Sequence, residues 1–574
     1  MLNFSSLKRK VLRHRIYLIA GFFAYLILSF WFSGLQNLGN LISLKLYAAD
    51  TPNSKIFRFL YDAVQRCEPI KRPDVNSLRD SEKCLGGDVP FNPVDVSSKG
   101  SYENLDRCLH LTDSQLKNLK SKHSEFIERV RKFLANNDRI AVDSFANETG
   151  IVTVGGGKFS VLSLIMIEML REKGSKLPVE VIIPPSDEGD VDFCAAIADL
   201  NAKCVFFSDV IPKKLIEQIP IKGYQFKIIA LLISSFKKVL FLDADNLPLV
   251  NPDQLFEQPV FLETGLVIWP DIWGRVTSPA FYQSAGVEID LNSRVRYMGD
   301  DISPVARFHD PKWTRSDILS MIPLHDLKGA IPDPTSESGQ LLVDKTKHLS
   351  TLLLAAYYNF HSEWYFRLLS QGTSGEGDKE TFIAAAHVLK EPYYQVKTQI
   401  VIDGFFDEDN SFHGICLYQF NPQQDYDQHN HAKHWMAKHQ QEYTTYDPSY
   451  DIEKDFYDKW MKRDNGEPID AMFGHASFHK FEPLALARER IYVDRKGHHF
   501  RGFKRYDITK GFDIELFNYK LLYRKLCSAR PLKFKFYQSS MNTEEWSDMC
   551  RYLAEHIKHL QSTHHLALSA QNIP

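Results

Sequence analysis

Strands and helices alternate along the middle of this chain, and no other feature of the sequence restricts its fold as strongly. Segments rich in β-branched and apolar residues predict strands at GIVTV (150–154), VEVIIP (179–184), CVFF (204–207), VLFL (239–242) and GLVIW (265–269). Residues 159–173 and 224–236 lie between them and have the length and apolar spacing of helices. This order predicts an α/β fold with a mostly parallel sheet that is covered on both faces. Ligands of such a sheet bind beyond the carboxyl ends of its strands.

The Asp-x-Asp spacing occurs four times, and one copy differs from the others because it follows an apolar strand directly. The four pairs are Asp190/Asp192, Asp243/Asp245, Asp407/Asp409 and Asp425/Asp427. Side chains two residues apart on a strand share one face, so Asp243 and Asp245 would place two carboxylates together at the end of VLFL. Such oxygen ligands suit Mn²⁺ or Mg²⁺, which would neutralise the charge that develops on a departing diphosphate. The alternative interpretation is that the two aspartates only solvate a loop.

A phosphatase with an aspartate nucleophile would also carry Asp-x-Asp after a strand. Such an enzyme normally has Thr or Val two residues after the second aspartate, and its motif lies near the start of its fold. This chain has Leu247 at that position, and α/β chain from about residue 150 precedes the motif. The phosphatase is therefore the less favoured alternative.

Two further segments contain residues that could approach a substrate. The glycines at 155–157, followed by Lys158, would let backbone amides approach a phosphate at a helix N-terminus, or they would form only a tight strand-to-helix turn. The segment GEGDKET (375–381) places Glu376, Asp378 and Glu380 before a predicted helix. Acidic residues at such a position often serve only as caps or as partners of the helix dipole.

An apolar run near the N-terminus follows a basic cluster. The first 49 residues contain no Asp or Glu, and the cluster consists of Lys8, Arg9, Lys10, Arg13 and Arg15. Residues 16–35 suffice to cross a bilayer core of about 30 Å, which takes about 20 helical residues. Because basic flanks stay cytoplasmic, we expect a cytoplasmic tail over 1–15, a transmembrane signal anchor over 16–35 and a lumenal remainder. A cleaved signal peptide is the alternative, but its apolar region is normally shorter.

The predicted lumenal part divides into a stem and a catalytic domain. Residues 36–110 mix Pro, Ser, Gly and charged residues without clear periodicity, and we interpret them as a stem. Apolar residues near helical spacing predict a helix over 114–136. We expect the domain to occupy 111–574, with its core at about 150–400 and a C-terminal elaboration over 400–574.

Charge, cysteine and sequon patterns narrow the remaining possibilities. The formal net charge of -3 argues against a nucleic-acid binder. The eight cysteines form no CxxC pair, so a zinc ribbon is disfavoured, and an oxidising lumen permits disulfides whose pairing the sequence leaves open. Cys194 and Cys204 would also suit small buried groups beside a strand.

Asn147 begins the one sequon of the predicted lumenal part and is a predicted glycosylation site. Histidines scattered over 393–450 are interpreted as polar surface rather than a metal site.

Several long segments, in order, resemble a known family. They are GGGKFSVLSL, YQFKIIALLISSFKKVLFLDADNLPLVNPDQLFE, TGLVIWPDIWGR, ESGQLLVDKTKH and SQGTSGEGDKETF. They are similar to fungal α-1,2-mannosyltransferases that branch cell-wall mannan, members of glycosyltransferase family 71, which also contains α-1,3-mannosyltransferases. The resemblance covers about 150–397 and continues more faintly to about residue 482.

The resemblance implies a fold, a donor, an acceptor and a cellular location. It implies a GT-A-type fold, GDP-mannose as donor, Mn²⁺ rather than Mg²⁺ as cofactor, and an α-mannan or mannose-rich glycoprotein as acceptor. It also implies residence in the Golgi membrane and association with other mannosyltransferases. Two alternatives stay open, namely α-1,3 transfer and a non-catalytic subunit of a mannan-synthesis complex in the Golgi.

The resemblance also implies roles for individual residues. Asp243 and Asp245 would hold the metal and the nucleotide, with His475 as a third metal ligand. The implied donor-binding residues are Tyr224, Lys227, Asp243, Trp269, Asp271, Gln340, Lys379 and Lys480, and the glycine-rich turn adds Gly156, Gly157 and Lys158 as candidate donor-binding residues. The implied catalytic residues are Asp378, Glu376 and Glu337. Transfer would retain the anomeric configuration, either through attack by a carboxylate or through entry of the acceptor beside the leaving diphosphate. Asp378 would be the nucleophile or a group that orients the acceptor.

Overall fold

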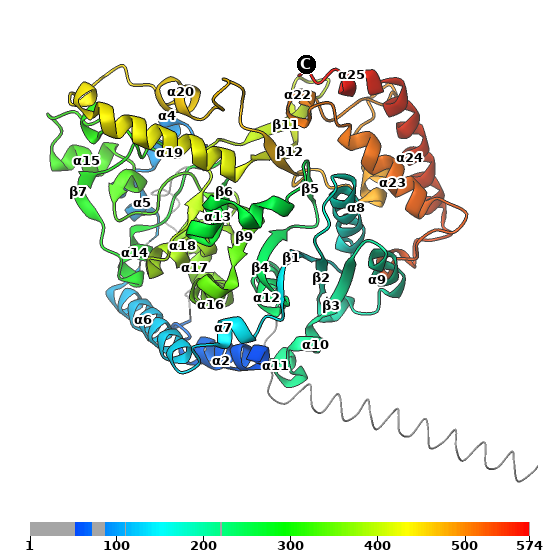
Figure 1. Ribbon diagram of the computed structural model, residues 1–574, viewed down its shortest axis with the longest axis horizontal. Helices are drawn as coiled ribbons and strands as arrows, with labels where there is room; N and C mark the ends of the chain where they lie inside the picture. Colours follow the sequence, from blue (N-terminus) through cyan, green and yellow to red (C-terminus); the bar gives the residue numbers. More distant parts are fainter. Residues whose placement is uncertain (1–51, 72–86, 110, 219–220, 573–574) are drawn as a thin grey trace, which may run out of the picture. The chain divides into compact units, whose positions relative to one another are not determined.

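A seven-stranded, mostly parallel sheet organises the fold (Figure 1). In spatial order its strands are β10 (Tyr394–Gln395), β6 (Leu266–Pro270), β9 (Ser336–Asp344), β4 (Phe236–Leu242), β1 (Asn147–Val154), β2 (Val179–Ile183) and β3 (Ala202–Phe206). Strand β9 runs antiparallel to β4 and β6, and the other pairs are parallel. Five of these strands overlap the predicted strand segments, so the predicted mostly parallel α/β fold is confirmed. The two that the sequence analysis missed are β9 and β10.

The computed structural model describes residues 52–71, 87–109, 111–218 and 221–572. The chain divides into two units, 1–58 and 59–574, and the second holds all the described strands. The predicted cytoplasmic tail and the transmembrane helix over 16–35 lie outside the described residues. Within the described ranges, no helix combines the length and the apolarity that crossing a membrane requires.

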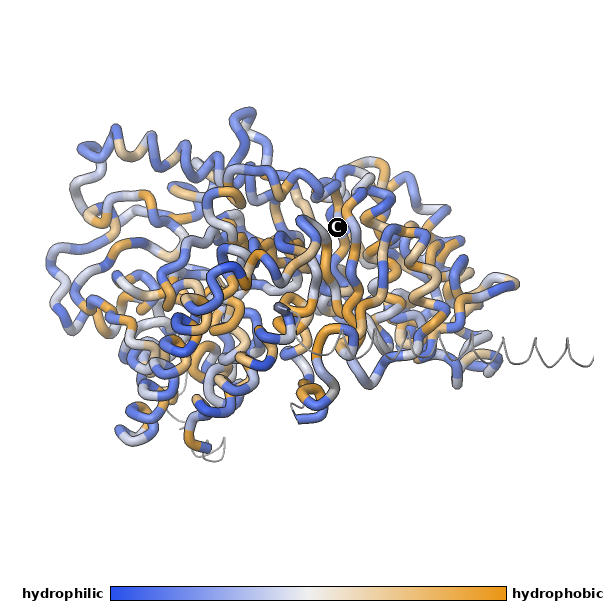
Figure 2. The backbone as a smooth tube through the Cα atoms, turned by 60° about the horizontal axis from the view of Figure 1, so that its bottom comes forward, coloured by the Kyte–Doolittle hydropathy of each residue, from blue (hydrophilic) through white to orange (hydrophobic). Residues whose placement is uncertain are grey.

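Helices cover the sheet and bury its strands. Helices that pack against it include α8 (Phe159–Glu172), α12 (Gln225–Ile233), α16 (Lys345–Phe360) and α18 (Lys379–Leu389). Every residue of β2 and β6 is buried, as expected for a sheet with helices on both faces. Figure 2 shows apolar residues concentrated in the interior of the fold, whereas hydrophilic residues prevail on outer helices.

A second, antiparallel sheet lies beside the first and carries part of the site. Its order is β11 (Val401–Phe406), β12 (Phe412–Phe420), β13 (Ala471–His475) and β5 (Asn246–Pro248). Strand β5 follows the Asp243–Asp245 motif directly in the chain. Its pairing with β13 therefore brings a segment more than 200 residues away to the end of β4.

Part of the predicted stem belongs to the folded body. Within 87–109 the chain forms α4 (Pro93–Lys99) and α5 (Tyr102–Cys108), which bury Val96 and Leu105. The amide of Phe91 donates to the carbonyl of Ile272 at 2.9 Å, so this segment is hydrogen-bonded to the chain that follows β6. Both helices are only seven residues long, too short to show a clear helical period in the sequence.

Two disulfides lie within the described residues. Cys194 in α9 (Val191–Ala198) is bonded to Cys204 in β3, so the interpretation of these two cysteines as unlinked buried groups is wrong. The second joins Cys527 and Cys550 between the C-terminal helices α23 (Ile514–Leu526) and α24 (Glu544–Ser562), which Figure 1 shows in orange and red. Disulfides of this kind fit an oxidising compartment.

Candidate active site

Asp243, Asp245 and His475 converge at the carboxyl end of β4. The two aspartates follow β4, and His475 is the last residue of β13. One ligand atom from each side chain lies within 4.8 Å of the other two, and His475 Nε2 is 3.3 Å from Asp245 Oδ1. Two carboxylates and an imidazole, with oxygen donors in the majority, fit a divalent ion such as Mn²⁺ or Mg²⁺. The structure thus brings together the three side chains expected to hold the metal.

The strands around His475 fix its position. His475 pairs with Asn246, the residue after Asp245. A Cβ at Gly339 would lie 2.6 Å from His475 Nδ1, so a larger residue on this part of β9 would displace the imidazole. The buried Asn246 side chain donates to the carbonyl of Gly339 at 2.8 Å and to Gln340 Oε1 at 2.5 Å. Gln340, which was expected to bind the sugar-nucleotide donor, is fully buried. Through Asn246 it supports the strand pairing that positions His475.

Lys227 joins the Asp-x-Asp motif to the GEGDKET segment. Its Nζ lies 3.1 Å from Asp243 Oδ2 and 3.6 Å from Asp378 Oδ2, and it donates to the carbonyl of Ser338 at 2.6 Å. Burial opposes the charge on Lys227, but Asp243, Asp378 and Glu337 outweigh burial and raise its pKa. Burial raises the pKa of Asp378 to about 6, against the attraction of Lys227. One ammonium group therefore holds two segments of the expected site together.

A second group of charged side chains lies beside His475 and consists of Glu337, Lys379 and Asp271. Glu337 Oε1 accepts from the amides of Ser338 and Gly339, both at 2.8 Å, and lies 3.6 Å from His475 Nδ1. Burial would raise the pKa of Glu337, but His475, Lys379 and Lys227 hold it well below its ordinary value. Lys379 donates to Asp271, whose pKa is raised chiefly by burial.

Lys480 is a further cation beside the Asp-x-Asp carboxylates. Lys480 donates to Asp245 Oδ2 and keeps a third of its side chain exposed. Burial lowers the pKa of Lys480, and the nearby positive charges of Lys158 and Lys227 act in the same direction. Lys227 and Lys480 therefore each contact one of the two aspartates, which gives a diphosphate charged partners at this site.

Two of the expected site residues have partners elsewhere in the fold. Trp269 has no exposed surface, and its indole N–H donates to the carbonyl of Phe420 at 2.8 Å, so the side chain packs inside the fold and its assignment to the donor stays a prediction. Glu376 accepts from the amide of Gly372 at 2.8 Å and lies 3.4 Å from Arg367, which makes it a support of its own loop.

Tyr224 and the glycine loop lie at the rim. Tyr224 precedes α12 and is 60% exposed. Its ring lies against Gly377, where an added Cβ would meet it at 3.4 Å. Gly156 and Gly157 have φ values of +94° and +55°, which favour glycine, and they form the turn between β1 and α8. The structure confirms this turn and leaves a phosphate role for the loop as a prediction.

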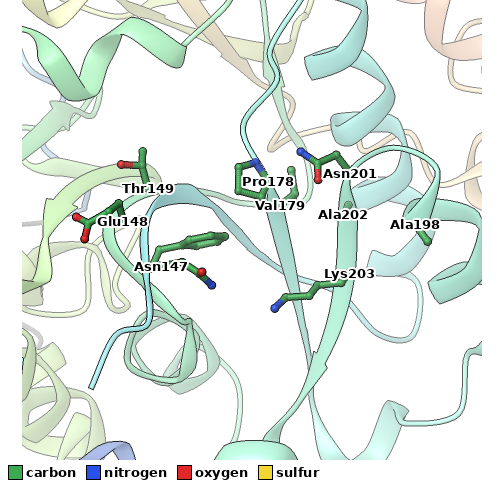
Figure 3. A pocket seen from close by; sticks show the side chains of 10 residues that line it. Asn147, Glu148, Thr149, Pro178, Val179, Ala198, Asn201, Ala202 and Lys203 are labelled. Atoms are coloured by element: carbon green, nitrogen blue, oxygen red, sulfur yellow. The ribbon is translucent and has the colours of Figure 1, made fainter. Parts of the chain in front are cut away.

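Asn147, the predicted glycosylation site, lies at the amino end of β1. It is exposed, and its Nδ2 donates to Ser235 Oγ at 2.8 Å. It borders an open hollow of about 600 Å³ together with Pro178 and Lys203 (Figure 3). This hollow is at the end of the sheet opposite to Asp243. Asn147 thus has the surface position that modification requires, and its glycosylation stays a prediction.

The residues that the sequence analysis missed are mainly structural partners of the site. Ser338 binds Lys227 through its carbonyl and its hydroxyl, at 2.6 and 2.8 Å. Asn246 and Gly339 position His475, as described above. Their only signal in the sequence is their place beside the acidic motifs, in DADN and ESGQ.

A mostly parallel α/β sheet with an Asp-x-Asp pair, a histidine and lysines at one strand end is the arrangement expected of a glycosyltransferase that takes a nucleotide-activated sugar. A family model described as "Mannosyltransferase putative" matches residues 148–453. The chain belongs to this mannosyltransferase family.

Relatives extend this similarity over most of the chain. The α-1,2-mannosyltransferase MNN5 of Saccharomyces cerevisiae (strain YJM789) is 40% identical over 550 residues, which cover 93% of this chain and 94% of that protein. The α-1,2-mannosyltransferase MNN2 of the same species (strain ATCC 204508 / S288c) is 37% identical over 505 residues, with coverage of 86% and 82%. MNN21 of Candida albicans, also an α-1,2-mannosyltransferase, is 36% identical over 479 residues, with coverage of 81% and 69%.

Among solved structures, the galactosyltransferase LgtC with donor and acceptor sugar analogs is 11% identical and covers 43% of this chain and 73% of its own. The TM-score of this comparison is 0.25.

Proposed function

We propose that this chain is an α-1,2-mannosyltransferase that moves mannose from GDP-mannose to α-mannan side chains of glycoproteins with retention of configuration. The observation that carries the proposal is its similarity, over 93% of its length, to an α-1,2-mannosyltransferase. The relatives named above favour α-1,2 over α-1,3 linkage. The convergence of Asp243, Asp245 and His475 argues against a non-catalytic subunit, which has no need of this arrangement.

In this proposal Asp243, Asp245 and His475 hold Mn²⁺, with Mg²⁺ as the second choice. A bound ion would supply positive charge that stabilises the diphosphate leaving group. Lys480 and Lys158 bind phosphate oxygens, and Lys227 keeps Asp243 and Asp378 in register. Asp378 meets the sugar, either as the nucleophile or as the group that orients the acceptor hydroxyl.

The chain is further proposed to reside in the Golgi membrane as a single-pass type II protein and to associate with other mannosyltransferases. The charge asymmetry around 16–35 supports the orientation, with 1–15 in the cytoplasm. The disulfides Cys194–Cys204 and Cys527–Cys550 support an oxidising lumen for the catalytic domain.

Donor choice tests the proposed function. Purified full-length chain in detergent is incubated with a short α-mannoside acceptor, Mn²⁺ and either GDP-mannose or a UDP-hexose. We expect transfer from GDP-mannose alone. Transfer from a UDP-sugar, or none from GDP-mannose by folded protein, would contradict the proposal.

Metal removal is expected to abolish transfer. The carboxylates of Asp243 and Asp245 and the imidazole of His475 would lose the ion that they share, leaving the diphosphate without its main counter-charge. Excess EDTA, followed by dialysis and titration with single metals, should give a loss of activity that Mn²⁺ restores best. Full activity in EDTA would show that these side chains do not act through a metal.

A further inference from the structure

The carboxylate of Asp187 lies against the glycine loop at the end of β1. Asp187 ends the short helix η1 (Pro185–Asp187), which follows β2. A Cβ on Gly156 would meet Asp187 Cβ at 2.7 Å, and one on Gly157 would lie 3.6 Å from Asp187 Oδ1. The side chain is half-buried, and the one hydrogen bond recorded for its carboxylate among the described residues comes from Ser186 Oγ at 3.3 Å. Most of the acceptor capacity of this carboxylate is therefore free.

A C-terminal segment places an aromatic ring beside the same loop. Phe536 belongs to η7 (Lys535–Tyr537), far outside the range of the family model. The ring is 49% exposed, and its Cδ2 would lie 3.9 Å from a Cβ on Gly157.

The residues around Phe536 anchor its segment. Phe534 is buried against Phe193 of α9, with ring centroids 5.8 Å apart. The amide of Lys535 donates to Asp190 Oδ1 at 3.2 Å, and the buried Tyr537 donates its hydroxyl to Glu482. With its neighbours buried or hydrogen-bonded, the segment holds the Phe536 ring at the surface beside the loop.

The order of the strands sets the distance between Asp187 and the metal ligands, and this distance suits the span of a nucleoside diphosphate. Strands β4, β1 and β2 are adjacent and parallel, so Asp243 and Asp187 follow strands that are two positions apart. At about 4.8 Å per strand this separation is about 10 Å along the carboxyl edge of the sheet. Lys158 follows the glycine loop directly and precedes α8, so it places a positive charge at this loop. A nucleoside diphosphate with its phosphates at Asp243 would extend its base toward Asp187.

We propose that Asp187 and Phe536 form the guanine subsite of the donor site, an inference that rests on the proposed function. Guanine presents two adjacent donors, N1–H and the 2-amino group, which match the two oxygens of one carboxylate. Uracil presents a single N–H between two carbonyl oxygens, which the Asp187 carboxylate would repel. The Phe536 ring stacks on the base, as aromatic side chains do without regard to its substituents. Asp187 thus selects the base, and Phe536 adds affinity.

The test compares GDP with IDP, whose base lacks only the 2-amino group. Dissociation constants are measured by titration calorimetry with the full-length chain in detergent and Mn²⁺. The wild type should bind GDP about tenfold or more tightly than IDP, since a hydrogen bond to a carboxylate is lost. Asp187→Asn should weaken GDP binding about tenfold or more and reduce the GDP/IDP ratio toward one. Phe536→Ala should weaken GDP and IDP equally, by about tenfold.

Matched controls separate these effects from general damage. Asp199→Asn changes an exposed aspartate after α9, and Phe412→Ala removes a ring of similar exposure, 47%, on β12. Both should bind as the wild type does. If Asp187→Asn kept the wild-type GDP/IDP ratio, Asp187 would not belong to the subsite, and if Phe536→Ala kept the wild-type affinities, Phe536 would not belong to it. Transfer from GDP-mannose by the wild type would still support the proposed function in either case. Failure of the wild type to bind GDP would overturn both the subsite and the function.

Discussion

Replacing Asp245 with alanine is expected to lower kcat/KM for mannose transfer by about a thousandfold or more. Asp245 is buried at the end of β4 and lies 3.3 Å from His475, so its loss removes one of the three converging ligands. A bound metal contributes several kcal/mol of charge stabilisation, and about 1.4 kcal/mol corresponds to a factor of ten in rate. Initial rates with GDP-mannose and an α-mannoside acceptor at saturating Mn²⁺ measure the effect.

The chain contains a matched control for this variant. Asp409 is the second aspartate of another Asp-x-Asp pair, but it lies exposed in the turn between β11 and β12, where it pairs with Arg495. Asp409→Ala should keep wild-type kinetics. If Asp245→Ala retained most of the activity while its circular dichroism matched the wild type, the assignment of the metal site would be wrong.

Replacing Glu380 with alanine is expected to lower the free energy of unfolding by about 3–5 kcal/mol. Glu380 forms a salt bridge with Arg275, and both side chains are almost completely buried. It also accepts from the amide of Ser336 at 2.6 Å. Burial already lowers the pKa of Arg275, and removal of Glu380 would leave this guanidinium without its carboxylate partner. Urea unfolding followed by tryptophan fluorescence measures the loss.

Glu376, in the same segment, provides the comparison. Its side chain is 23% exposed and its partner Arg367 is 26% exposed, so solvent weakens the pair. Glu376→Ala should change the free energy of unfolding by about 1 kcal/mol or less. Equal losses in the two variants would contradict the structural role given to Glu380.

The metal site shows what local sequence can predict. An apolar strand followed by Asp-x-Asp indicates the strand end and the proximity of Asp243 and Asp245, because both depend on neighbouring residues. The two aspartates lie in the turn after β4 and not on the strand itself, so strand alternation is not what brings them together. His475 depends on the pairing of β13 with β5, a contact across more than 200 residues, and only a resemblance to a family indicated it. Strand β9 has a short apolar run at 341–343, but its antiparallel place between β4 and β6 depends on contacts distant in the sequence.

Side-chain direction and environment are harder to predict from local sequence. The register of β6 against β9 shifts between Ile268 and Trp269, and such irregularities re-aim side chains, so the strand end gave no guide to where Trp269 would lie. In GEGDKET the sequence presents three similar acids. Burial and the nearest cation distinguish them, because Asp378 lies beside Lys227, whereas Glu380 pairs with Arg275 inside the core.

The linkage of the product tests the central claim most directly. The full-length chain is incubated with GDP-mannose, Mn²⁺ and a short α-1,6-mannan acceptor, and the product is digested with an α-1,2-specific mannosidase and analysed by NMR spectroscopy. We predict that the acceptor gains one α-linked mannose, that the mannosidase removes this mannose, and that the product shows the anomeric signals of an α-1,2 linkage. A product that resists the mannosidase and shows an α-1,3 or a β linkage would contradict the account.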